Sequence, residues 1–106
     1  MTPQEITIAV AELDGWNHWF NGWNKSYENI EPLILTEQLP PYLTSRDAIV
    51  PVIEKQDEAT RWRFIHYLLK IPTGGYINYK DVELALLAPV SHLCEALLRA
   101  TGKWKD

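Results

Sequence analysis

Residues 15–44 are the part of this chain that most constrains its fold. The stretch Gly15–Tyr27, GWNHWFNGWNKSY, contains three of the five tryptophans, Trp16, Trp19 and Trp23, together with Phe20, Tyr27 and three asparagines. Asparagine and glycine favour turns over regular helix. The backbone of Leu39–Pro41 is expected to be extended, because residues before proline avoid the helical region. We therefore predict a Trp-rich loop over 15–44, in which Pro32–Thr36 could form a short strand.

Start and stop signals outside this loop predict four helices, over residues 2–14, 45–56, 57–71 and 89–101. Thr2, Ser45 and Asp57 are the expected N-caps of the first three, since their side-chain oxygens can accept from free backbone N–H groups. Gly15 and Gly102 are expected to end the first and last helices in the left-handed conformation.

The fold class follows from this arrangement and from the length of 106 residues, which corresponds to one domain. We predict a small, mainly helical α+β single domain over 1–106. Short strands, with 30–39 and 76–80 as candidates, could form an α-β-α sandwich. The pattern of residues 76–88 fits a strand at its start and a helix later, so this stretch stays ambiguous.

Charge and cysteine content limit the partners and the compartment. The net charge is −4 and there is no long basic run, whereas nucleic-acid binding draws on a basic face. The single cysteine, Cys94, is expected to be buried; it excludes an internal disulfide and fits a reducing compartment. No apolar run reaches the roughly 20 residues that a membrane span needs. We expect a cytoplasmic protein that binds neither nucleic acid nor membrane.

The sequence contains no pattern that predicts catalysis or metal binding. His18, His66 and His92 do not share a metal-ligand spacing, and no phosphate loop or nucleophile motif is present. His18 and Asp14 could meet across the Gly15 turn as an acid–base pair, with an exposed loop histidine as the alternative. We therefore predict a protein that is not an enzyme and has no cofactor.

Six residues are the candidate ligand-binding residues: Trp16, Trp19, Phe20, Trp23, Arg61 and Arg63. For the rings before residue 24, either at least two pack in the core or they form an exposed surface for stacking or oligomerisation. For Arg61-Trp62-Arg63, either Trp62 is in the core on a stripe with Ile65 and Leu69, or the trio clamps an anion. Further cationic candidates are Arg46 and Arg99.

Three segments of the chain together resemble a known family. Gly15-Trp16 closes the first helix, Pro41–Ile49 reads Pro-Tyr-Leu-Thr-Ser-Arg-Asp-Ala-Ile, and Leu93–Trp104 reads Leu-Cys-Glu-Ala-Leu-Leu-Arg-Ala-Thr-Gly-Lys-Trp. In this order, over nearly the whole chain, they resemble the phage ABA sandwich domain family. The resemblance implies a small α+β domain of phage or prophage origin. It implies no chemistry and no catalytic residues.

Three functional hypotheses follow. In the first, a phage accessory protein sequesters a small nucleotide-like molecule that a host uses in immune signalling, through aromatic stacking and a few arginines in an oligomer of identical chains. In the second, the aromatic surface binds and inhibits a host defence protein, and the acidic charge steers it toward a basic partner. In the third, the chain is a phage structural or genome-handling protein, which its acidic charge disfavours.

Overall fold

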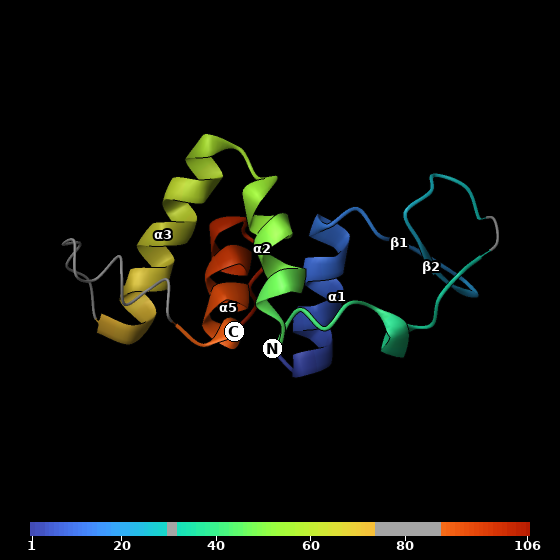
Figure 1. Ribbon diagram of the computed structural model, residues 1–106, viewed down its shortest axis with the longest axis horizontal. Coiled ribbons are helices and arrows are strands. Elements are labelled where there is room, and N and C mark those ends of the chain that lie inside the picture. Colours follow the sequence, from blue (N-terminus) through green and yellow to red (C-terminus); the bar gives the residue numbers. More distant parts are fainter. Residues whose placement is uncertain (30–31, 74–87) are drawn as a thin grey trace.

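The chain folds into a bundle of α-helices with a β-hairpin at one end (Figure 1). The computed structural model describes the backbone of residues 1–29, 32–73 and 88–106, and their side chains except those of 69–73. Its elements are α1 (Pro3–Leu13), β1 (Asn17–Trp19), β2 (Gly22–Asn24), the 3-10 helix η1 (Thr36–Gln38), α2 (Arg46–Glu54), α3 (Glu58–Thr73) and α5 (Val90–Ala100). The molecule measures 48 Å along its longest axis and 25 Å across.

The predicted N-caps hold the starts of three helices. Thr2 forms the expected capping box with Glu5 at the start of α1, which satisfies two N–H groups that the helix leaves free. Ser45 accepts from the Ala48 N–H at 3.3 Å, and Asp57 accepts from the Thr60 N–H at 2.7 Å. The caps therefore fix where α1, α2 and α3 begin.

The two predicted glycine terminators are also confirmed. Gly15 has φ +96°, and the Trp16 N–H donates back to the Ala11 carbonyl at 3.0 Å. Gly102 has φ +75°, and the Lys103 N–H donates to the Leu98 carbonyl at 2.8 Å. Both ends are Schellman motifs, which need a left-handed residue that glycine adopts without a Cβ penalty. The first of them turns the chain out of α1 toward the hairpin.

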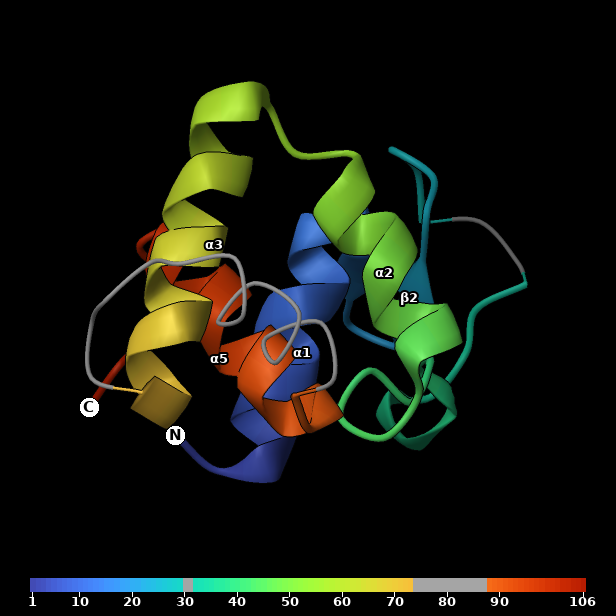
Figure 2. The same cartoon turned by 60° about the vertical axis from the view of Figure 1, so that its left-hand side comes forward.

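Helix α5 is the centre of the core and packs against α1, α2 and α3 (Figures 1 and 2). Its buried residues are Leu93, Cys94, Ala96, Leu97, Leu98 and Ala100. Cys94 is buried as predicted, and burial raises the pKa of its thiol to about 12. The chain ends meet beside this core, where the Met1 ammonium donates to the Lys105 carbonyl at 3.4 Å.

The buried face of α3 differs from the predicted one. Phe64 and Leu68 are buried, whereas Trp62 is 66% exposed, so the prediction of Trp62 in the core is wrong. Apolar residues occur nearly all around this helix, and contact with α5 rather than helical period decides which of them are covered. Helix α3 also continues to Thr73, beyond the predicted end at residue 71.

The sheet forms in a different place from the predicted one. Strands β1 and β2 lie inside the segment 15–44 that the sequence predicts as a loop, which also contains η1. Within 32–39, Ile34 makes a single bridge to Trp23, and residues 76–87 lie outside the described residues. The described chain is thus α+β and mainly helical. None of its helices combines the length and the apolar character needed to cross a bilayer.

Candidate functional site

The hairpin projects from the end of the bundle next to α1, and its strands are joined by a two-residue loop (Figure 1). Asn17 pairs with Asn24, His18 with Trp23 and Trp19 with Gly22. The loop residues are therefore Phe20 and Asn21, at the tip.

Trp23 connects the hairpin to the segment that contains Ile34 and Thr36. Its side chain is 1% exposed, and its indole N–H donates to the Thr36 hydroxyl at 3.0 Å. Its backbone exchanges two hydrogen bonds with Ile34, of 2.8 and 2.9 Å. The His18 ring stacks on the outer side of Trp23, with ring centroids 4.3 Å apart. Trp23 is thus a structural ring with no face open to a ligand.

Gly22 allows the segment around Ile34 to approach β2 closely. A Cβ at position 22 would lie 2.8 Å from the Ile34 carbonyl oxygen and 3.0 Å from the Leu33 Cβ. We predict that Gly22→Ala lowers the free energy of unfolding by about 1–2 kcal/mol, measured by urea denaturation. Asn21→Ala, at the exposed tip, is the control and should change it by less than about 0.5 kcal/mol. Equal stability of the two variants would contradict the proposed contact.

Asn24 organises the loop that follows β2. Its side-chain oxygen accepts from the Trp19 indole N–H at 2.8 Å and from the Ser26 N–H at 3.1 Å. Its amide donates to the Glu28 carbonyl at 3.1 Å, and the Asn17 amide donates to the Ser26 carbonyl at 2.7 Å. These bonds fix the Trp19 ring against β2 and hold residues 25–28 in one conformation.

Asp14 joins the hairpin to the helices. Its carboxylate accepts from the Tyr42 hydroxyl at 2.6 Å and from the Lys55 ammonium at 2.5 Å, and it lies 3.3 Å from the Lys25 ammonium. Lys25 also lies 5.4 Å from the centre of the Trp16 ring, a cation–π geometry. Asp14 therefore connects the end of α1, the hairpin, the loop before α2 and the end of α2.

The charge state of this cluster is set by its contacts. Burial raises the pKa of Asp14, but the hydrogen bonds from Lys55 and Tyr42 and the two ammonium charges outweigh it, so the pKa lies below its usual value. Burial and the neighbouring Asp14 raise the pKa of the Tyr42 hydroxyl. Asp14 is thus ionised at neutral pH, and its partners are Tyr42 and two lysines. The possible pair of Asp14 with His18 is not formed, and His18 is exposed on β1, as in the alternative interpretation.

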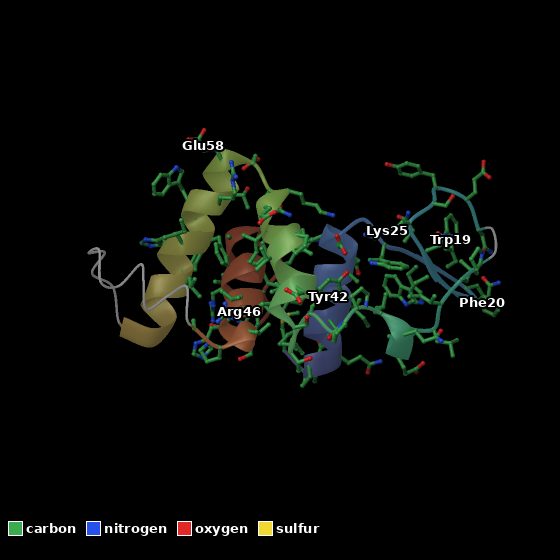
Figure 3. All side chains as sticks on the ribbon, viewed as in Figure 1. Trp19, Phe20, Lys25, Tyr42, Arg46 and Glu58 are labelled. Atoms are coloured by element: carbon green, nitrogen blue, oxygen red, sulfur yellow. The ribbon has the colours of Figure 1, made fainter. Side chains whose placement is uncertain are left out.

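Two aromatic rings on the hairpin point into solvent. Phe20, at the tip, is 106% exposed, and Tyr27, in the loop after β2, is 94% exposed. Figure 3 shows Phe20 at the far end of the molecule from the helices, beyond Trp19 and Lys25. Because internal bonds hold both loops, these rings are presented on a fixed scaffold. Tyr27 was not among the candidates from the sequence.

The predicted site residues fall into two groups at opposite ends of the molecule. Trp16, Trp19, Phe20 and Trp23 belong to the hairpin end, whereas Arg61 and Arg63 belong to α3, whose first residue, Glu58, is labelled at the other end in Figure 3. At least two of the hairpin rings are structural, since Trp23 is in the core and Trp16 packs against it. One ligand cannot contact both groups within one chain.

Three of the arginines make internal contacts. Arg63 donates to the Ala100 carbonyl at 3.2 Å and so gives this carbonyl, at the end of α5, a hydrogen-bond partner. Arg46 donates to the Ala88 carbonyl. Arg99 is bound to Glu95 at 3.3 Å and stacks over Trp104 at 5.1 Å. Arg61 is exposed and shares a shallow hollow of about 310 Å³ with Glu58, Trp62 and Ile65. Arg63 does not line this hollow, and an anion clamp of Arg61 with Arg63 stays a prediction.

Comparison with protein-family models, with curated proteins and with solved structures finds no match for this chain. Within the described residues there is also no group of three or more histidine, cysteine, aspartate or glutamate side chains placed to hold a metal ion.

Proposed function

We propose that this protein acts by binding a partner protein through the hairpin, with Phe20 as the anchor. The observation that carries the proposal is a fully exposed phenylalanine at the tip of a hairpin that is held by internal contacts such as the Trp23–Thr36 hydrogen bond. An exposed apolar ring costs free energy in water, and aromatic residues are enriched at the centres of protein interfaces. Tyr27 supplies a second exposed ring in the neighbouring loop.

A hairpin that is already ordered is better suited to binding a partner than a flexible surface loop. Ordering a mobile loop on binding costs about 0.5–1.5 kcal/mol for each immobilised side chain. Here the Trp23, Asn24 and Asp14 contacts order the hairpin in the free protein. A pocket on the partner would then receive Phe20 with little rearrangement of this chain.

The biological setting is part of the same proposal and comes from the resemblance to the phage ABA sandwich domain family. We infer a phage accessory protein that acts without catalysis in the host cytoplasm and inhibits a host defence factor. The acidic net charge of −4 favours a partner with a basic rim around the pocket for Phe20. The α-β-α sandwich, with 30–39 and 76–80 as its predicted strands, also stays a proposal.

Site-specific photo-cross-linking tests the anchor. A photoreactive phenylalanine at position 20, in protein expressed in the host cell, should give a discrete adduct with one protein. The same group at Val50, an exposed apolar residue on α2, is the matched control and should give none. Wild-type protein added in excess should suppress the adduct. Equal labelling from positions 20 and 50 would refute recognition through the hairpin.

Sequestration of a nucleotide-like molecule remains the second candidate function. It needs an aromatic face open to stacking beside a cation, and the exposed Trp62 lines one hollow together with Arg61. Titration with mono- and dinucleotides, followed by tryptophan fluorescence, would test it. Quenching that disappears in Trp62→Phe would support this function, and no change at micromolar nucleotide would reject it.

A further inference from the structure

Helix α3 carries a second patch, centred on the exposed Trp62, beside the face that packs against α5; Ile65, at the edge of this patch, is partly buried against the core. Phe64 and Leu68 form the face buried against α5, and Trp62 lies on another side of the helix. Glu58, Arg61, Trp62 and Ile65 line one shallow hollow there. Their spacing of three, four and seven residues places them on one stripe of the helix. A largely exposed tryptophan in such a stripe is typical of an interface, where tryptophan is the most enriched residue type.

The spacing of the stripe is symmetric about its centre. Arg61 and Trp62 are adjacent at its centre, and Glu58 and Ile65 lie at equal distances on either side. Two antiparallel copies of α3, related by a twofold axis between Arg61 and Trp62, would therefore set Arg61 of one against Trp62 of the other, twice. Arginine and tryptophan opposed in this way can form a cation–π contact. A twofold interface must use the same patch on both chains in this way.

The charges of the stripe also indicate which molecule binds to it. The stripe contains one acid, Glu58, and one base, Arg61, so its formal charge is zero. An anionic nucleotide would meet the Glu58 carboxylate beside the arginine. A second copy would instead place Glu58 of one chain one helical turn from Arg61 of the other, about 6 Å along the axis. The balance of charges thus fits an identical chain better than an anion.

We propose that the protein forms a homodimer through this stripe of α3, with the two helices antiparallel. The hairpins then lie at the two outer ends, because the hairpin and α3 occupy opposite ends of each chain (Figure 1). Four lining residues from each chain are far fewer than the roughly 20–30 per side of a standard interface. The dimer is therefore expected to be reversible and to depend on concentration.

Sedimentation velocity of the whole chain, from about 1 to 500 µM, tests the association. Wild type should shift from monomer to dimer within this range, and Trp62→Ala should weaken the dimer at least about tenfold. Phe20→Ala, which removes an exposed ring at the other end, is the matched control and should leave the dimer unchanged. Circular dichroism checks that both variants fold. A wild-type monomer throughout, or a dimer unaffected by Trp62→Ala, would overturn the proposal.

Disulfide cross-linking tests the register. A mixture of the Glu58→Cys and Ile65→Cys chains should form a cross-linked heterodimer, because these positions lie opposite each other across the twofold axis. Each variant alone should form none, since equal positions lie about 10 Å apart along the axis and a disulfide needs Cα atoms within about 7 Å. Cys94 gives no background, because it is buried. Cross-linking of either variant alone as fast as the mixture would exclude this antiparallel pairing.

Discussion

Replacing Trp23 with alanine should lower the free energy of unfolding by about 3–5 kcal/mol, the range for loss of a buried tryptophan. Trp23 is 1% exposed and belongs to the core. Its removal leaves a cavity under the hairpin and deletes the hydrogen bond to Thr36. It also removes the ring on which His18 stacks. Urea unfolding followed by circular dichroism measures the loss.

Phe20→Ala is the control for this prediction, since it removes a ring from the same hairpin. Phe20 is fully exposed, so we expect a change within about 0.5 kcal/mol. The pair of variants separates the structural ring from the proposed binding ring. Equal destabilisation by the two changes would contradict the division between an inner Trp23 and an outer Phe20.

The helix ends could be predicted from the sequence because they depend on local contacts. Thr2, Ser45 and Asp57 bond to N–H groups three residues later, and Gly15 and Gly102 take left-handed φ angles. Capping and termination of this kind involve neighbours in the chain and hardly depend on the rest of the fold.

The hairpin was missed although one local signal was present. Asn-Gly, here Asn21-Gly22, between short aromatic segments is a hairpin signal, although the turn it indicates is one residue later than the observed loop of Phe20 and Asn21. The surrounding asparagines also indicate a loop. Asn24 decides between the two, since it is buried and bonds to Trp19, Ser26 and Glu28. That network exists only after the strands pair, so composition alone could not predict it.

Which aromatic rings are buried and which are exposed could not be predicted from the sequence, for a related reason. On α3 the apolar residues include Ala59, Trp62, Phe64, Ile65, Tyr67 and Leu68, which at 3.6 residues per turn occur on all sides of the helix. Helical period then gives no unique buried stripe. The contact with α5 buries Phe64 and leaves Trp62 exposed, and this contact joins residues about thirty positions apart.

Asp14→Asn should lower the free energy of unfolding by about 2–4 kcal/mol at neutral pH. It removes the charge that Lys55 and Lys25 face and weakens the acceptor of the Tyr42 hydroxyl. Removing one member of a partly buried ionic cluster leaves its partners without compensation. Tyr42→Phe, which deletes one hydrogen bond and keeps both ion pairs, should cost about 1 kcal/mol. A larger loss in Tyr42→Phe than in Asp14→Asn would show that the charge of Asp14 contributes little.

The same cluster predicts how stability depends on pH. Because the pKa of Asp14 in the fold lies below its usual 3.8, the unfolded chain binds more protons in that range and stability rises with pH. The contribution is complete above about pH 5 and is lost as the pH falls through the lowered pKa. Glu5 and Asp57 also have lowered pKa values, so wild type and Asp14→Asn must be compared. The variant should lose less stability between pH 5 and pH 2, and equal losses would refute the predicted role of Asp14.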